Sequence, residues 1–392
     1  MRTVLGNIGR LFVGDGTVVE QAAVAVEDGA IAWVGREVEL TARAEGAEID
    51  LEGRLLTPGL VDAHSHPLYA GERFAEIALR SAGGSYSEIA AAGGGIGSTV
   101  AATRQASPEA LAGALTGRLG HWLEGGTTTL EAKTGYHLDK EGELGEVALL
   151  AEAARADDVP SLEITFLAAH APGPEWEGDL DGYAEEVARW CPAAKARGAR
   201  HIDVFCDAGY FSPEQARLVL EAGRKAGLRP RIHADELART GGAELAAELG
   251  CLSADHLLAL DGAGVAALAG GGVVATLAPV TALAMGRTPP ARQLLEAGVV
   301  VALGTDHNPG TSGTTSMSLV VALAVSVLGL SVTEALVAAT AGGAASLGLS
   351  DRGLVRPGMR ADLVAWEADH EGAFAWSYGL GAAAVWKGGV TC

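Results

Sequence analysis

Two histidines separated by one residue, His64 and His66, stand where an apolar run ends in the segment LLTPGLVDAHSHPLYAGER. We predict a buried β-strand over residues 55–62, and alternate residues at a strand end point to the same side. Two imidazoles aimed at one point suit a divalent metal ion. Such a pair is also common as a packing or solvated group, so the metal interpretation depends on finding further ligands.

Further candidate groups each follow an apolar run of their own. His233 and Glu236 stand at the end of GLRPRIHADE, and Asp306 stands at the end of GVVVALGTD. A third run, GCLSADH, ends in Asp255 and His256. In a parallel α/β barrel, the carboxyl ends of the strands form the face on which active sites are built. Three histidines and one aspartate are a nitrogen and oxygen ligand set typical of zinc, iron(II) or manganese, with a position left for water.

The middle of the chain alternates between apolar, β-rich runs and helical patterns. This alternation favours a (β/α)8 barrel of the TIM type over an open sheet. No GxGxxG or Walker sequence follows the first run, which argues against a nucleotide cofactor. The eight runs are residues 55–63, 126–134, 162–170, 201–209, 229–236, 251–256, 273–279 and 299–306.

Both ends of the chain contain short alternating segments typical of strands. In AVAVEDGAIAWVG, Asp28 and Gly29 form a turn signal between two such segments. Because chain ends often lie close together, we predict that residues 1–56 and 352–392 form one small, β-sandwich-like domain. Residues 57–351 would then form the barrel, and a chain of 392 residues is long enough for both.

Composition narrows the classes of partner and compartment. The net charge of −21 argues against nucleic acid and anionic membrane surfaces as partners, because both require a basic patch. An anionic substrate would need a local positive pocket. Four cysteines without paired spacing indicate a reduced, cytoplasmic protein. We find neither a signal peptide nor a run of about eighteen apolar residues that would predict a membrane span.

The motifs carry a resemblance to a known family. LTPGLVDAHSH, HADE, SADH and GTDHNPG resemble the amidohydrolase superfamily, and the resemblance covers nearly the whole chain. Longer segments, among them EAKTGYHLD, FLAAHAPGPEW and TDHNPGT, are similar to the imidazolonepropionase family of histidine degradation. That family hydrolyses the cyclic amide 4-imidazolone-5-propanoate to N-formimino-L-glutamate with a single zinc or iron ion.

The resemblance implies a role for individual residues and a homodimeric assembly. One divalent metal per chain, zinc or iron(II) with manganese also compatible, would be held by His64, His66, His233 and Asp306. A metal-bound hydroxide would attack the ring carbonyl with Glu236, His256 and Asp306 as catalytic residues. A guanidinium binds a carboxylate bidentately, so Arg73 would bind the propanoate group. The implied substrate contacts are Arg73, Tyr86, Tyr136, His170, Asn308, Gly310 and Thr311.

Alternatives remain open at several points. A deaminase of a small heterocycle shares this metal core, but Arg73 and the two tyrosines favour a substrate with a carboxylate. A catalytically silent binding protein would not need the complete ligand set. His307 replaces the family's usual aromatic residue and residues 277–293 replace its usual loop, which bears on specificity. Lys133 is either a carboxylated lysine that bridges two metals or an ordinary lysine, and the mononuclear family favours the latter.

Overall fold

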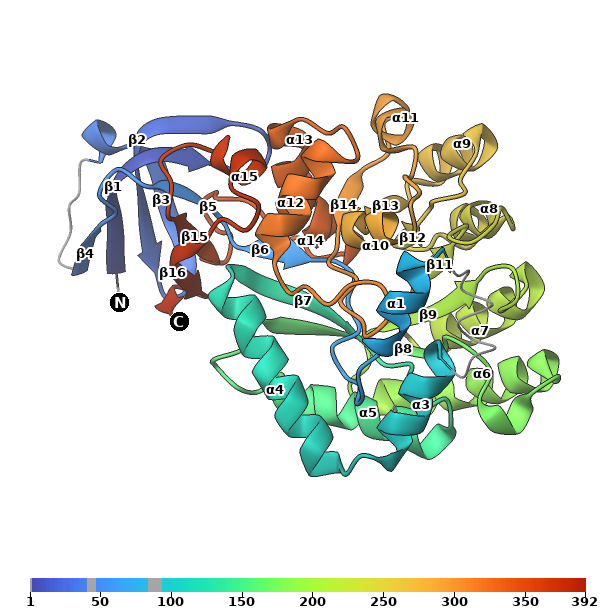
Figure 1. The fold of residues 1–392 in the computed structure, drawn as a ribbon. Helices are drawn as coiled ribbons and strands as arrows, with labels where there is room; N and C mark the ends of the chain where they lie inside the picture. The colour runs from blue at the N-terminus through green and yellow to red at the C-terminus, as the bar shows by residue number, and fades with distance from the viewer. Residues whose placement is uncertain (1, 41–46, 84–93) are drawn as a thin grey trace.

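The protein combines a large parallel barrel, surrounded by helices, with a smaller mixed sheet at one side (Figure 1). A computed structural model describes residues 2–40, 47–83 and 94–392. The predicted fold class, a (β/α)8 barrel with a small β-domain built from both chain ends, is confirmed. Within the described residues, none of the helices has the length and apolar character that crossing a membrane requires.

The barrel strands run parallel and follow one another in chain order. Backbone hydrogen bonds from Ala63 N to Leu303 O (3.1 Å) and from Asp306 N to His64 O (2.8 Å) join the last strand to the first. The strands are β6 (Leu60–Asp62), β7 (Thr127–Lys133), β8 (Ser161–Ala169), β9 (His201–Cys206), β11 (Ile232–Ala234), β12 (Ser253–His256), β13 (Val274–Leu277) and β14 (Val301–Leu303), and β10 (Arg229–Pro230) pairs with β9. Each of the eight predicted runs contributes one strand to the barrel.

Helices cover the outside of the barrel, and several present an apolar stripe to it. In α4 (Pro108–Glu124) the buried residues Leu111, Leu115, Leu119 and Trp122 recur at spacings of three or four. The Ser107 side chain caps the first turn of this helix by accepting from Ala110 N. The other helices are α1 (Ala75–Ser81), α3 (Ile96–Gln105), α5 (Lys140–Ala153), α6 (Leu180–Ala196), α7 (Pro213–Lys225), α8 (Gly242–Leu249), α9 (Gly262–Gly271), α10 (Pro279–Ala284), α11 (Ala291–Glu296), α12 (Met317–Ser326), α13 (Val332–Val337), α14 (Gly343–Ser346) and α15 (Ala373–Trp376).

The smaller sheet joins the two ends of the chain. Its order is β17-β16-β15-β5-β1-β2-β3, with β4 paired to β1, and the antiparallel pairing of β15 with β5 connects the C-terminal strands to the N-terminal ones. Asp28 and Gly29 turn between β2 and β3 with φ angles of 49° and 82°. The strands are β1 (Arg2–Phe12), β2 (Val18–Glu27), β3 (Ala30–Arg36), β4 (Ala47–Asp50), β5 (Leu55–Pro58), β15 (Leu363–Trp366), β16 (Ala382–Lys387) and β17 (Val390–Thr391).

The single strand predicted over residues 55–62 is two strands in the structure. β5 belongs to the smaller sheet and β6 to the barrel, with Gly59 between them. A Cβ atom on Gly59 would lie 2.1 Å from Thr128 Oγ1, so only glycine fits where the chain passes from one sheet to the other. The largely apolar sequence reflects burial in both sheets, and the pair Pro58-Gly59 is the turn signal at this break that our prediction of a single strand overlooked.

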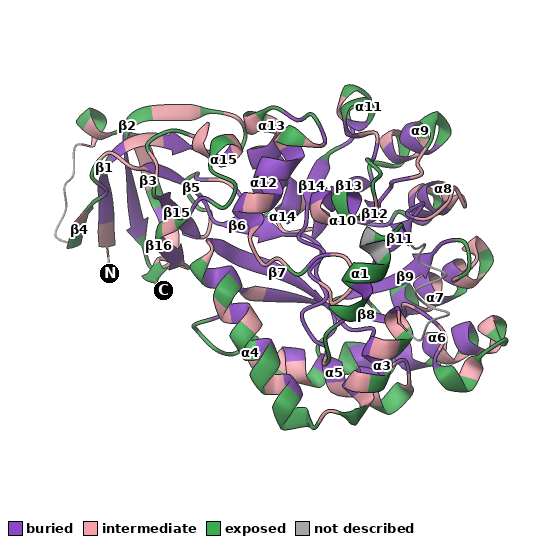
Figure 2. Cartoon of the chain, viewed as in Figure 1, coloured by how far each residue is buried: buried purple, intermediate pink, exposed green. Residues whose placement is uncertain are grey.

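The barrel strands and the outer faces of the helices differ in solvent exposure. Figure 2 shows the barrel strands buried and the outward faces of the surrounding helices exposed. The main apolar cluster fills the space between barrel and helices, and a second cluster, which includes Leu5, Ile8, Val24 and Trp386, fills the smaller β-domain. The polar residues discussed below are therefore exceptions within an otherwise apolar interior.

Candidate active site

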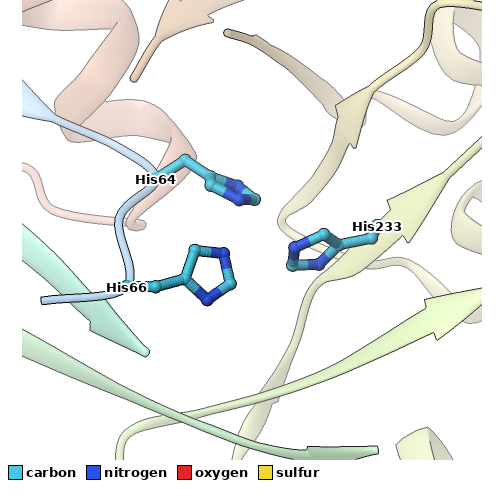
Figure 3. Close-up of side chains that lie close together, drawn as sticks. All are labelled: His64, His66 and His233. Carbon is cyan, nitrogen blue, oxygen red and sulfur yellow. The ribbon is translucent and has the colours of Figure 1, made fainter. Parts of the chain in front are cut away.

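The histidines predicted from the sequence meet at the carboxyl ends of the barrel strands. His64 and His66 follow β6, and His233 lies in β11. Figure 3 shows the three rings facing one another. Their centroids are 5.3 Å apart for His64 and His66, 4.6 Å for His64 and His233, and 5.5 Å for His66 and His233. The parallel barrel brings together side chains that are separated by some 170 residues in the chain.

Asp306 completes this cluster from the end of β14. Its Oδ1 atom lies 3.6 Å from His64 Nε2 and 3.5 Å from His66 Nε2. His256, at the end of β12, also joins the cluster, with its ring centroid 4.8 Å from that of His64. His256 and Asp306 have φ angles of 74° and 47°. Non-glycine residues in this left-handed region store strain and are frequent at functional sites.

The donor atoms of this cluster fit a divalent metal ion. Ligand atoms of His64, His66 and His233 all lie within 4.8 Å of one another. The Nε2 atoms of His64 and His233 are buried and have no hydrogen-bond partner among the described residues. An unsatisfied buried polar atom is costly. Burial lowers the pKa of His64 and His66 well below the ordinary value, so both rings are neutral and able to bind a metal.

Two aspartates that the sequence analysis did not select as ligands or catalysts lie behind the rings. His64 Nδ1 is 2.7 Å from Asp255 Oδ2, and His233 Nδ1 is 3.0 Å from Asp203 Oδ2. Burial opposes ionisation of Asp255, but Arg231 and Lys133 outweigh it and lower its pKa to about 2. Asp203 interrupts the apolar run HIDVF of β9. That interruption is the sequence signal for a buried polar partner.

Glu236 and His256 form a second pair beside the cluster. Glu236 Oε1 lies 3.7 Å from His256 Nδ1. The Glu236 backbone N donates to Asp207 Oδ2 over 2.6 Å, which fixes the turn after β11. Burial raises the pKa of Glu236 to about 7. A carboxyl group with such a pKa can give and take a proton near neutral pH.

A small cavity of about 90 Å³ opens above these groups. A larger cavity of about 530 Å³ also contacts Ile96, but none of the clustered histidines lines it. Tyr86 lies outside the described residues, and His64 is buried and does not line the cavity. The small cavity is lined by His66, Arg73, Ile96, Tyr136, His170, Phe205, Tyr210, His233, Glu236, Leu237, His256, Met285, Asp306, Asn308, Gly310 and Thr311. The described substrate contacts that the resemblance implied are all in this lining, whereas Phe205, Tyr210 and Met285 were not anticipated.

Arg73 is paired to a carboxylate that the sequence analysis missed. Its Nε and Nη2 atoms donate to Glu76 Oε1 and Oε2 over 2.8 and 2.7 Å, and both side chains are buried. Gly95 N also donates to Glu76 Oε1 over 2.8 Å. A Cβ atom on Gly310 would lie 2.6 Å from Arg73 Nη1. The absence of a side chain at Gly310 thus lets the guanidinium approach the loop that follows β14.

Asn308 shapes the loop after β14. Its Oδ1 accepts from Gly310 N and Thr311 N over 2.7 and 2.8 Å, and its Nδ2 donates to Asp306 O over 2.6 Å. This is an Asx-type turn. The amide thereby sets the positions of Gly310 and Thr311 at the cavity wall.

Two buried glutamates anchor the loop that carries Tyr136. Glu146 Oε2 accepts from Gly135 N over 3.1 Å, and Glu143 Oε1 accepts from Leu138 N over 2.9 Å. Gly135 O in turn lies 3.1 Å from Nδ1 of His170, whose ring stacks on that of His66. Burial raises the pKa of each glutamate to about 8. The α5 helix therefore supports the cavity wall through groups that keep a proton at neutral pH.

His307 points away from the cavity. Its Nε2 lies 3.1 Å from Tyr69 Oη and its Nδ1 lies 3.1 Å from Thr314 O. Its ring packs edge-on against Trp122 at 5.0 Å, and burial lowers its pKa to about 4. These contacts describe a residue that packs behind the site.

Comparison with known proteins relates the chain to one family. The sequence matches the amidohydrolase family over residues 55–390. An imidazolonepropionase from Geobacillus kaustophilus strain HTA426 is 44% identical over 384 residues, which cover 95% of this chain and 90% of that protein. An imidazolonepropionase from Anaeromyxobacter dehalogenans strain 2CP-C is 46% identical over 378 residues with the same two coverages.

Solved structures share the fold at lower sequence identity. A Xaa-Pro dipeptidase with bound methionine aligns over 100% of both chains with a TM-score of 0.76 and 17% identity. A zinc-bound adenosine deaminase from Xanthomonas campestris aligns over 99% of this chain and 92% of its own with a TM-score of 0.72 and 20% identity. These likenesses support the fold assignment alone.

Proposed function

The chain belongs to the imidazolonepropionases of the amidohydrolase family, and from this premise we propose that it hydrolyses 4-imidazolone-5-propanoate to N-formimino-L-glutamate. It is a hydrolase that acts on the C–N bond of a cyclic amide. The observation that carries the proposal is the convergence of His64, His66, His233 and Asp306 beside a cavity that also presents Arg73.

The site takes a divalent metal, and we propose that His64, His66, His233 and Asp306 hold one ion per chain. Zinc and iron(II) suit this ligand set, and manganese is compatible with it. When bound, such an ion activates a water molecule at neutral pH and polarises a carbonyl oxygen. The unpartnered Nε2 atoms of two ligands support this assignment.

We assign the proton transfers to three side chains that surround the cluster. Water adds its oxygen to the ring carbonyl carbon, the bond from that carbon to the adjacent ring nitrogen breaks, and the nitrogen gains a proton. Asp306 takes the proton from the water, and Glu236, with a pKa near 7, delivers a proton to the nitrogen. His256 stabilises the carbonyl oxygen as it becomes negative.

The rest of the cavity would hold the substrate. Arg73 supplies positive charge to a chain with a net charge of −21 and binds the propanoate carboxylate. Tyr136, His170, Gly310 and Thr311 line the remaining walls. We propose that Asn308 contributes by holding the last two in place.

The test is the ultraviolet-monitored loss of freshly prepared 4-imidazolone-5-propanoate by protein whose metal content has been measured. We expect rapid turnover with about one metal ion per chain. Turnover of aminoheterocycles in its place would favour the deaminase alternative. A metal-loaded protein that turns over neither class would overturn the proposed substrate.

Three further features stay predictions. We propose that the chain forms a homodimer in the cytoplasm. We also propose that residues 1–56 and 352–392 together form one domain and that residues 57–351 form the other. Size-exclusion chromatography with light scattering tests the dimer. Limited proteolysis tests the division.

A further inference from the structure

Five charged side chains fill the barrel interior directly beneath the histidines. All five have no exposed surface. Burial of charges is expensive unless each is paired, and two cations face three anions here. We call this set the buried ion network: Glu131, Lys133, Asp203, Arg231 and Asp255.

Two cations hold the three carboxylates in place. Lys133 Nζ lies 2.8 Å from Glu131 Oε1 and 2.7 Å from Asp203 Oδ2. Arg231 lies 2.9 Å from Glu131 Oε1 through Nε and 3.1 Å from Asp255 Oδ2 through Nη2. Each aspartate therefore contacts a cation through Oδ2, the same oxygen that faces its histidine.

The network contacts the metal cluster through its two aspartates. Asp255 Oδ2 faces His64 Nδ1 at 2.7 Å, and Asp203 Oδ2 faces His233 Nδ1 at 3.0 Å. A carboxylate accepts hydrogen bonds and does not donate them, so the hydrogen bond at His64 favours a proton on its Nδ1. At His233 the negative charge of Asp203, 3.0 Å from Nδ1, favours the same tautomer electrostatically. The Nε2 atom of each ring then keeps its lone pair for a ligand.

We propose that Asp255 and Asp203 are positioning residues that fix the tautomer and ring orientation of His64 and His233. Lys133 and Arg231 hold the aspartates in place. The inference rests on the proposed metal site, and it also assigns a role to Lys133. Its ammonium group lies among three carboxylates, where a carboxylated lysine would add a fourth anion. Lys133 is thus a structural cation and not a bridge between metals.

Glu131 provides a matched control within the network. It is buried to the same extent as Asp255 and shares Arg231 with it. Its other partners include Thr165 Oγ1 at 2.5 Å, and no hydrogen bond joins it to a histidine among the described residues. Loss of its charge therefore tests the network's electrostatics without removing an acceptor from a metal ligand.

The experiment compares Asp255→Ala, Asp255→Asn and Glu131→Gln. Each protein is stripped of metal and titrated with zinc against a chromophoric chelator, and thermal unfolding of the metal-free form reports on its fold. Asp255→Ala removes the acceptor, so we expect a 10- to 100-fold weaker zinc affinity, of the order found for partners of metal ligands. Asp255→Asn removes a charge but keeps a side-chain oxygen that can accept from His64 Nδ1, and Glu131→Gln removes a charge while Asp255 stays in place. We therefore expect losses below about fivefold for both on the same scale.

Equal losses of zinc affinity in all three variants would show that the effect comes from charge alone and would overturn the positioning role. An unchanged zinc affinity in Asp255→Ala would also overturn it. If Asp255→Ala does not fold, nitrogen-15 spectra of the histidines in the metal-free wild type decide the question. We expect the Nδ1-protonated form for His64 and His233, and the opposite tautomer would refute the proposal. These measurements need no substrate, so a failure of the proposed reaction would be seen separately.

Discussion

Replacement of Arg73 by methionine separates substrate binding from chemistry. Methionine keeps much of the aliphatic length and removes the guanidinium that faces the cavity. Arg73 lines the same cavity as the groups assigned to proton transfer but is not one of them, so the change removes the cation that would bind the substrate carboxylate and leaves those groups in place. We therefore expect KM to rise while kcat stays within a few-fold of wild type.

The size of the effect follows from the hydrogen bond between the guanidinium and the substrate carboxylate. A hydrogen bond to a charged group contributes about 1.5–3 kcal/mol net, and each 1.4 kcal/mol corresponds to about tenfold in affinity. We expect KM to rise by about 10- to 100-fold on these figures. The same change leaves the buried Glu76 without its bidentate partner. A buried acid that loses its charged partner and keeps the hydrogen bond from Gly95 N costs on the order of 1–3 kcal/mol of stability.

Two companion variants isolate these effects. Glu76→Gln keeps the Arg73 charge and removes its internal competitor, so KM should be unchanged or lower. The double variant Arg73→Met, Glu76→Gln should regain stability but not affinity. Initial rates over a range of 4-imidazolone-5-propanoate concentrations give KM and kcat, and urea unfolding gives stability. A folded Arg73→Met protein with the KM of wild type would refute the carboxylate-binding role.

Further predictions concern the metal ligand, the supporting glutamate and the residue behind the site. Asp306→Ala should lose turnover and bound metal together, as elemental analysis beside the activity assay would show; full activity would remove Asp306 from the site. The pKa of buried Glu146 is about 8 against an ordinary 4.5, so unfolding releases its proton between these pH values and stability falls as pH rises. Glutamine cannot ionise, so Glu146→Gln should reduce this fall in stability by up to about 1.4 kcal/mol per pH unit. Urea unfolding of both proteins at pH 5.5 and 7.5 would measure the difference. If the stability of the variant changed with pH as much as that of wild type, the assigned pKa would be wrong. His307→Phe should change kcat/KM by less than about threefold, because the ring packs outside the cavity; a large change in KM would place it in contact with substrate.

The sequence predicts the barrel because its eight runs each bury a strand, but it does not predict pairing partners. The run at residues 55–62 is largely apolar, and the strand pairing shows that it belongs to two sheets, with the break at Gly59. Hydrophobicity measures burial and not the neighbour against which a strand is buried. The boundary between sheets therefore requires three-dimensional packing.

The candidate site likewise contains residues that the sequence could predict and residues that it could not. Histidines and acids at strand ends could be selected from the sequence because their types suit a metal. Asp203 and Arg231 lie within segments rich in β-forming residues, and their function depends on partners distant in the chain. Glu76 is three residues from Arg73, a spacing typical of a pair on a helix surface, yet both side chains are buried. Sequence spacing does not reveal such burial.

The hydrogen bonds that close the barrel also determine when the metal site can exist during synthesis. Ala63 pairs with Leu303 across about 240 residues of chain, and His64 pairs with Asp306 at the same seam. A nascent chain presents His64 and His66 long before the last strand has been made. The complete ligand set therefore arises only after the ribosome has delivered β14, so capture of the ion reports that ring closure is finished. A chain truncated before β14 would keep the three histidines but lack the aspartate that completes the site.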